Sequence, residues 1–194
     1  MWFGLKKKAL KRREPRAAAF RSRDLVRELR PHVAAFLKEH HFKRLGDQSW
    51  IADHSGSYLI LAVQARQSGW DNRAGGRFIV EFEVTSRPVR GTGFRRERLW
   101  RLLDVEQRES VISINDAVAL SLPKPHPRLL AQLGSSVAAH YLLQFQPMKP
   151  VAGQIDMWFQ YYDESDAAVW GAFLSQALHP AMTKFLSGDL AMIE

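Results

Sequence analysis

Histidines and carboxylates are the side chains of this sequence that could ligate a metal or transfer protons. The seven histidines include no HExxH pair and no four-ligand zinc spacing, so we expect no bound metal. Glu81 and Glu83 lie two residues apart, and paired carboxylates can act as general acid and base. Because they alternate with apolar residues along one strand, however, we expect both on its solvated face. These residues therefore predict no catalytic site and no cofactor.

No segment has the spacing of a loop that binds phosphate or carries a nucleophile. Gly75-Gly76 falls between two expected strands, whereas a phosphate-binding loop leads from a strand into a helix. Ser135-Ser136 follows a glycine but lacks the GxSxG frame of a nucleophile elbow.

Positive charge is concentrated at the N-terminus. Residues 1–30 contain eleven basic and three acidic side chains, whereas residues 31–194 contain 17 of each, so the net charge of +8 lies in the first 30 residues. Lysine and arginine bind phosphate groups and release counterions, which gives affinity for nucleic acids without sequence preference. We therefore expect residues 1–21 to form a basic arm that binds an anionic partner. Its candidate contacts are Lys6, Lys7, Lys8, Lys11, Arg12, Arg13 and Arg16.

Two other interpretations of the arm stay open. A basic terminus can be a solvated extension that only adds solubility. Alternatively, Trp2, Phe3 and Leu5 precede the lysines, and apolar residues beside cations are typical of segments that bind an anionic membrane surface. The amphipathic pattern is weak, because Lys6 falls on the apolar face of the helix and Pro15 limits its length.

A second candidate binding surface is the loop of residues 68–76. It carries a tryptophan in a polar setting, and tryptophan and arginine are enriched in the energetically dominant parts of protein interfaces. The alternative is that Trp70 folds back over the apolar face of the sheet, since large apolar side chains are usually covered. The candidate recognition residues are Arg66, Trp70, Asn72, Arg73 and Arg77.

The elements that must position these residues begin with a helix and a sheet. Ser22 can cap a helix that runs to about His41, and Pro31 should kink or restart it. Strict alternation of apolar residues then indicates strands with one buried face, and short connections favour antiparallel pairing. The expected strands cover residues 50–53, 58–67 and 78–85.

The second half of the chain predicts helices. Asp104, with Gln107 three residues later, is a capping-box arrangement that begins a helix ending near residue 121. Further helices are expected over residues 127–144 and after the polar residues at 163–166, with Pro180 dividing the last one. Segments 94–103 and 155–162 fit strand or helix equally well.

Together these elements predict an α+β fold, with an antiparallel sheet of three to five strands packed by an N-terminal helix and C-terminal helices. We expect a basic arm, residues 1–21, and a single domain, residues 22–194. The sequence has no cysteine, no apolar run of about 18 residues to span a membrane, and no apolar stretch of the secretory-signal type after the lysines. A cytoplasmic location is therefore expected.

The order of motifs over residues 25–87 resembles a bacterial domain family of unknown function. The first helix ends in Phe36-Leu37-Lys38, followed by Phe42-Lys43-Arg44, and a strand with Trp50 comes next. The later motifs are Val63-Gln64-x-x-Gln67-Ser68-x-Trp70 and Phe78-x-Val80-x-Phe82-x-Val84. His41 stands where the family usually has a glycine, and Gly46 comes later. The resemblance covers about a third of the chain, implies a small α+β domain, and supplies no catalytic residue.

The function expected from these features is that of a non-catalytic binding module, such as a regulatory or immunity-type partner of another protein. One alternative is association with nucleic acid or an anionic membrane surface through residues 1–21. The other is an enzyme whose ionisable groups converge only in the fold.

Overall fold

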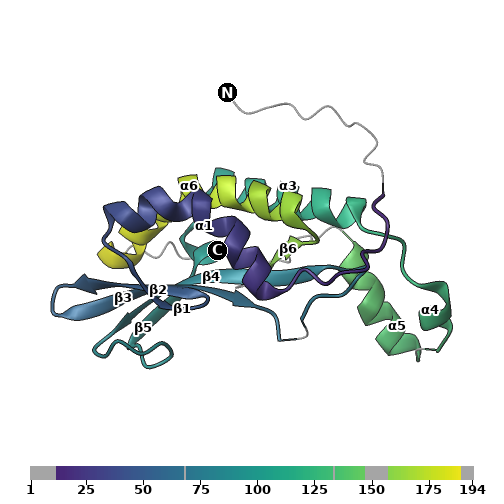
Figure 1. Cartoon of the computed structure of the whole chain (residues 1–194), viewed down its shortest axis with the longest axis horizontal. Coiled ribbons are helices and arrows are strands. Elements are labelled where there is room, and N and C mark those ends of the chain that lie inside the picture. The colour runs from purple at the N-terminus through teal and green to yellow at the C-terminus, as the bar shows by residue number, and fades with distance from the viewer. Residues whose placement is uncertain (1–11, 68, 133, 147–156, 189–194) are drawn as a thin grey trace.

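A layer of helices covers one face of an antiparallel sheet in the computed structural model of this chain (Figure 1). The structure describes residues 12–67, 69–132, 134–146 and 157–188. The predicted α+β fold, an antiparallel sheet packed by an N-terminal helix and C-terminal helices, is confirmed. None of the described helices combines the length and the apolar character that crossing a bilayer requires.

The described residues form a sheet of six strands in the order β1-β2-β3-β4-β5, with β6 also paired to β4. Every pairing is antiparallel, and consecutive strands from β1 to β4 are joined without an intervening helix. β6 pairs with the first three residues of β4 and β5 with its second half, so these two strands share one edge. The strands are β1 (Lys43–Gly46), β2 (Ser49–His54), β3 (Ser57–Ala65), β4 (Gly76–Thr85), β5 (Arg95–Arg98) and β6 (Phe159–Tyr161).

Alternation along β4 divides the sheet into a face toward the helices and an opposite face. Phe78, Val80 and Phe82 are at most 2% exposed and belong to the main hydrophobic core. Glu81 and Glu83 lie on the opposite face, because successive side chains of a strand point to opposite sides. The three predicted strands are present as β2, β3 and β4 with ends within two residues of those expected, whereas β1 was not predicted.

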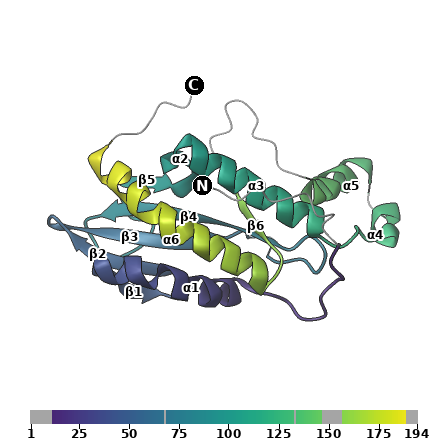
Figure 2. The ribbon, with the colours of Figure 1, turned by 90° about the horizontal axis from the view of Figure 1, so that it is seen from above.

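Three long helices, α1 (Ser22–Glu39), α3 (Val105–Ser121) and α6 (Glu164–Ser187), lie side by side over the sheet, with α6 between the other two (Figure 2). α1 and α6 run in the same direction (Figure 2). The apolar stripe that predicted α1 is buried, as expected for a helix that packs one face on a sheet. Its residues are Leu25, Leu29, Val33, Phe36 and Leu37.

The predicted division at Pro180 is wrong, because α6 continues through it, and Pro31 lies inside α1, so that helix does not restart there. A proline removes one backbone hydrogen bond and crowds the carbonyl four residues earlier. Both prolines are exposed, so water can bind the carbonyl that loses its N–H partner. Buried residues on either side of each proline, such as Leu178 and Ala181, hold the helix in place.

Side-chain caps begin the helices near the predicted residues. The Asp104 carboxylate accepts the backbone N–H of Gln107 at 2.8 Å, and the Gln107 side chain accepts the backbone N–H of Asp104 at 3.1 Å, so the predicted capping box of α3 is confirmed. The carboxylate of Asp163 caps α6. In α1 the N-cap is Arg21, one residue before the predicted Ser22.

Shorter elements replace two of the expected segments. The helix predicted over residues 127–144 is divided into α4 (Pro127–Gln132), α5 (Ser135–Leu142) and the 3-10 helix η1 (Leu143–Phe145). Residues 94–103 contain both expected alternatives, because β5 is followed directly by α2 (Leu99–Leu102).

α3 covers the edge strand β6 through one buried side chain. The Asn115 carbonyl oxygen accepts the backbone N–H of Gln160 at 2.7 Å, and the Asn115 amide donates to the Trp158 carbonyl at 3.0 Å. Asn115 is fully buried, so it takes the place of a further strand at this edge and fixes α3 above the sheet.

Candidate functional site

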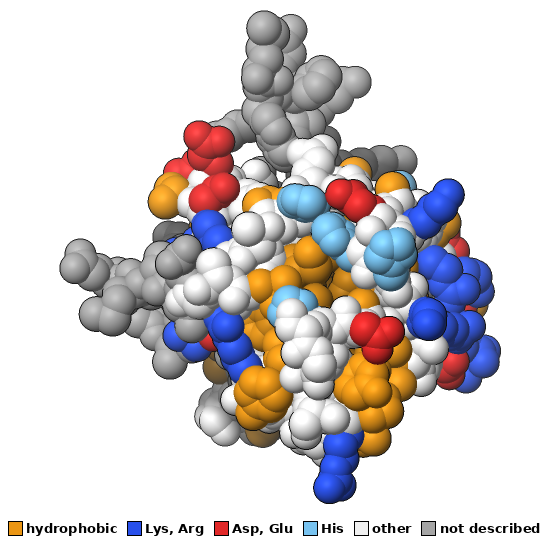
Figure 3. Space-filling view, turned by 90° about the vertical axis from the view of Figure 1, so that its left-hand side faces the viewer, with side chains coloured by type: hydrophobic (Ala, Val, Ile, Leu, Met, Phe, Trp, Pro, Cys, Tyr) orange, Lys and Arg blue, Asp and Glu red, His pale blue; other side chains and the backbone are white. Residues whose placement is uncertain are grey.

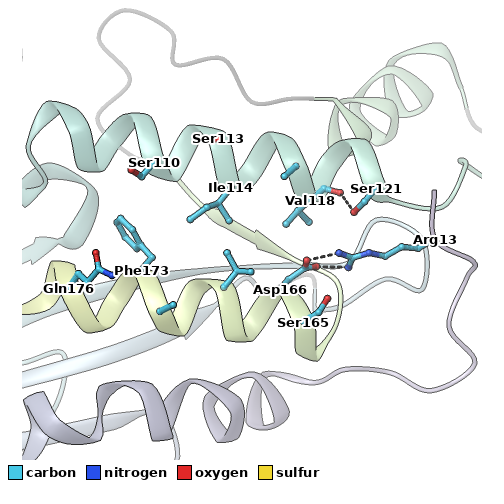
Figure 4. Close-up of a pocket in the computed structure, with 13 residues that line it drawn as sticks. Arg13, Ser110, Ser113, Ile114, Val118, Ser121, Ser165, Asp166, Phe173 and Gln176 are labelled. Carbon is cyan, nitrogen blue, oxygen red and sulfur yellow. Dashed lines mark hydrogen bonds and ion pairs between the residues drawn. The ribbon is translucent and has the colours of Figure 1, made fainter. Parts of the chain in front are cut away.

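The N-terminal segment is attached to the domain from Arg13 onward. The Arg13 backbone N–H donates to the Ser121 carbonyl at 2.8 Å, and its guanidinium donates two 2.6 Å hydrogen bonds to the Asp166 carboxylate (Figure 4). The Asp163 carboxylate lies 3.0 Å from the same guanidinium. Burial would lower the pKa of Arg13, but the hydrogen bonds and charge of Asp166 raise it above its ordinary value.

Two further contacts continue this attachment along the chain. The Arg16 guanidinium lies 2.6 Å from the Glu164 carboxylate, and this hydrogen bond lowers the pKa of Glu164. Phe20 is 2% exposed and packs edge-on against Tyr161, with 5.9 Å between ring centroids. Part of the predicted arm, residues 1–21, is therefore attached to the domain through Arg13, Arg16 and Phe20.

The candidate anion-binding residues of the arm are consequently not equivalent. Arg13 and Arg16 are paired with carboxylates of this chain, which reduces their availability to an anionic partner. Arg12 is exposed. Lys6, Lys7, Lys8 and Lys11 lie outside the described residues.

Trp70 takes the covered position that the sequence offered as its alternative. Its indole N–H donates to the Tyr162 carbonyl at 2.9 Å, and the two rings lie 5.6 Å apart between centroids. The side chain is partly buried against both hydrophobic clusters of the domain. Trp70 therefore helps to hold the loop on the domain rather than standing free as an interface side chain.

The other candidate recognition residues are spread over this region. Arg73 donates to the Lys124 carbonyl at 2.6 Å, and the Asn72 carbonyl accepts the Tyr162 hydroxyl at 2.8 Å. Arg77 lies on β4 opposite Gln160, and burial together with the nearby charge of Arg66 lowers its pKa.

Arg66 and Trp70 line a common cleft of about 480 Å³ beside the start of α1. Arg21 and Gln48 also line it, so its walls mix charged, amide and aromatic groups. Of the five predicted recognition residues, the described lining of this cleft includes only these two.

A groove of about 450 Å³ lies between α3 and α6, and the sequence did not predict it (Figure 4). Ile114, Val118 and Phe173 give it an apolar lining, and Val169 at its side is 50% exposed. The walls carry small side chains at helical spacing, Ser113 and Ala117 on α3 among them, and short side chains leave the space between the helices unfilled.

The two ends of this groove differ in charge. At one end Arg13 pairs with Asp166 and also lies 3.0 Å from Asp163. At the other end the groove adjoins a second cavity of about 210 Å³, with Ser110 and Phe173 shared between the two. Asp104 and Glu106 line this second cavity, and no lysine or arginine is among its described lining residues. The groove is therefore apolar along its length and acidic at one end.

Glu81 and Glu83 are buried, so the prediction that they lie on a solvated face is wrong. Glu81 is 1% exposed, and its carboxylate lies 2.6 Å from the guanidinium groups of both Arg90 and Arg96. Glu83 is 2% exposed and accepts the backbone N–H groups of Gly91 and Gly93. The connection between β4 and β5 thus folds back under the sheet and covers both acids.

Gly93 shows why that connection can approach so closely. A Cβ atom at this position would lie 2.3 Å from the Glu83 side chain, so only glycine fits. Both carboxylates are engaged in holding the connection, which favours a structural role over acid–base chemistry.

Comparisons with protein-family models, with curated proteins and with solved structures find no match to this chain. The resemblance of residues 25–87 to a bacterial domain family stays a prediction that depends on its motifs. The functional assignment therefore depends on geometry and charge.

Proposed function

We propose that this protein is a non-catalytic binding module whose groove between α3 and α6 holds a short, apolar and positively charged segment of a partner protein. The observation that carries the proposal is the combination of an apolar groove with an acidic end, formed by Asp104 and Glu106. Apolar lining provides affinity, and the carboxylates select a cationic ligand.

The dimensions of the groove suit a peptide. Its volume of about 450 Å³ lies within the roughly 300–1,000 Å³ of ordinary ligand sites. Its wall on α3 runs from Ser110 to Ser121, which is about 16 Å at 1.5 Å per helical residue. That length accommodates about eleven residues of a helix or about five of an extended chain. A helix in an apolar groove is a common mode of peptide recognition.

Charge distinguishes this ligand from other apolar molecules that could fill the groove. An anionic lipid or fatty acid would place its head group near Asp104 and Glu106 or near Asp166 and Asp163, which already share Arg13. Among the described lining residues of both cavities, Arg13 is the only lysine or arginine, and it is already paired with Asp166. A lysine-bearing segment has a favourable position at the acidic end.

Association with nucleic acid or an anionic membrane through residues 1–21 stays an alternative. It would depend on Arg12 and the lysines at positions 6, 7, 8 and 11, because Arg13 and Arg16 are paired with acids of this chain. Such binding would weaken steeply as salt is raised, whereas binding in an apolar groove would keep much of its affinity.

The test uses a fluorescently labelled amphipathic peptide of leucine and lysine, titrated with the full chain and followed by anisotropy. Ser113→Trp fills the groove from an exposed wall position and should weaken binding at least about tenfold, or 1.4 kcal/mol. Glu106→Lys should weaken binding and reduce its dependence on salt. Ala34→Trp, at an exposed position of α1, is the matched control and should bind like the wild type.

Three results would contradict this function. One is an unchanged affinity of Ser113→Trp, and another is equal binding of a peptide in which glutamate replaces every lysine. The third concerns residues 1–11, which precede Arg13 in the chain and combine lysines with Trp2 and Phe3. Deleting residues 1–11 should leave the affinity for the peptide unchanged. A higher affinity after the deletion would show that residues 1–11 of this chain, and not a partner protein, occupy the groove.

A further inference from the structure

The end of the molecule at which α1 and α6 run beside each other gathers histidine side chains (Figure 3). The two helices are parallel, and α1 packs closely on α6 at Gly171, where a Cβ atom would lie 2.4 Å from the His32 ring. Eight residues further along each helix come His40 and His179. Because two parallel helices advance equally per residue, the close contact at Gly171 places this second pair opposite each other.

Three donor atoms from the two helices converge at this point. His40 Nε2 and His179 Nδ1 are 3.1 Å apart. Glu39 Oε1 lies 3.8 Å from His179 Nδ1 and 4.0 Å from His40 Nε2. His40 packs on Phe36, with 4.8 Å between ring centroids, so one of the two rings is held by the core. Glu39 and His179 are 63% and 57% exposed and can adjust their rotamers.

We propose that Glu39, His40 and His179 bind one divalent first-row transition-metal ion, of the Zn²⁺ class, between the C-terminal end of α1 and the neighbouring turn of α6. Imidazole nitrogen and carboxylate oxygen are ligands that Zn²⁺ accepts, at bond lengths of about 2.0–2.2 Å. Two ligands of one such ion lie about 2.9–3.5 Å apart in tetrahedral or octahedral geometry. The nitrogen pair already has this spacing, and the exposed Glu39 carboxylate must move by about 0.5 Å to reach it.

The number of ligands sets the character of the site. Three protein ligands leave at least one coordination position for water or a further group. Magnesium and calcium prefer oxygen ligands, so a site with two imidazoles should discriminate against them. The ion would join the C-terminal end of α1 to α6 and stabilise the folded chain by mass action.

A different explanation of the same geometry is a plain hydrogen bond between two neutral imidazoles. That arrangement needs one ring as donor and the other as acceptor, and gives Glu39 no role in binding. Metal binding instead requires all three side chains, so variants of the exposed members separate the two explanations.

The experiment titrates the full chain, free of any polyhistidine tag, with ZnCl₂ by isothermal calorimetry and with CoCl₂ by visible absorption. We expect one site per chain, with the Co²⁺ spectrum of a low-symmetry nitrogen and oxygen environment. His179→Ala should weaken binding by at least about 10–100-fold, the loss that removal of even an outer-shell partner produces. Glu39→Gln should weaken it less, and excess Mg²⁺ should not compete. Both substitutions are at exposed positions, and unchanged circular dichroism shows that the fold is kept.

His126→Ala, at the residue before α4 and outside both α1 and α6, is the histidine control and should retain the wild-type affinity. Absence of Zn²⁺ and Co²⁺ binding by the wild type would overturn the proposal. So would an affinity that His179→Ala leaves unchanged, or one that His126→Ala lowers as much as His179→Ala does, since each would assign the ion to other residues.

Discussion

The ion pair between Arg13 and Asp166 provides a direct measure of how firmly the N-terminal segment is joined to the domain. Exposed ion pairs contribute about 0.2–1 kcal/mol, whereas breaking a buried pair costs about 3–5 kcal/mol. The side chain of Asp166 is 6% exposed and that of Arg13 is 25% exposed, so this pair lies between the two classes. Its bidentate geometry, with two hydrogen bonds of 2.6 Å, favours a free energy above that of an exposed ion pair. We expect a coupling free energy of about 2 kcal/mol.

The assay is a double-mutant cycle of Arg13→Ala, Asp166→Asn and the double variant, with free energies of unfolding from urea denaturation. Asn retains an acceptor for the Tyr162 backbone N–H, which bonds the Asp166 carboxylate at 2.7 Å, so the cycle isolates the arginine contact. A loss of 2 kcal/mol corresponds to a fall in Tm of about 4–8 °C for a domain of this size.

Arg12→Ala is the matched control, because Arg12 is the exposed neighbour of Arg13 and its removal should leave Tm unchanged. A coupling free energy below about 0.5 kcal/mol would refute the reasoning. It would mean that the Arg13–Asp166 pair is no stronger than an ordinary surface ion pair and does not hold the N-terminal segment on the domain.

Three further outcomes test the packing around β4. Glu81→Gln should lower the free energy of unfolding by about 1–3 kcal/mol in urea, because it removes the charge that Arg90 and Arg96 share, although both arginines can rehydrate. Gly75→Ala should cost about 3 kcal/mol or more in thermal melts, because Gly75 has φ +71° and a Cβ there would lie 2.2 Å from the Tyr161 carbonyl oxygen. Burial raises the pKa of Tyr161 to about 12, so its contribution to stability is complete below pH 10 and is lost as the pH rises through 12. Ultraviolet titration of tyrosinate should show this late ionisation, and Tyr161→Phe should abolish it.

Sequence reasoning succeeded where one local signal decides the structure. The capping box of Asp104 and Gln107 begins α3 at the predicted residue, because both partners lie within one helical turn. The alternation of Phe78, Val80 and Phe82 gave the buried face of β4, since the period of a strand is fixed by its geometry.

It failed where a second, distant segment decides the outcome. Alternation placed Glu81 and Glu83 on the face opposite the core, but it carries no information about the connection that returns under that face. The groove has a weak local signal, the small residues Ser113 and Ala117 on α3, but its other wall lies on α6. His40 and His179 are 139 positions apart, so no spacing rule could join them. Only the register between α1 and α6, set at Gly171, brings them together.

The ion pair at Arg13 also determines the polarity of the proposed binding groove. At one end Arg13 offsets part of the charge of Asp166 and Asp163, whereas the described lining at the other end contains Asp104 and Glu106 and no lysine or arginine. A bound segment should therefore place its cations at the Asp104 end and its apolar side chains over Ile114 and Phe173. Replacing Arg13 by alanine would leave carboxylates at both ends and remove the electrostatic difference between the two orientations. In this arrangement a residue of the basic N-terminal segment acts on the acids of its own chain, and thereby selects the direction in which a basic ligand binds.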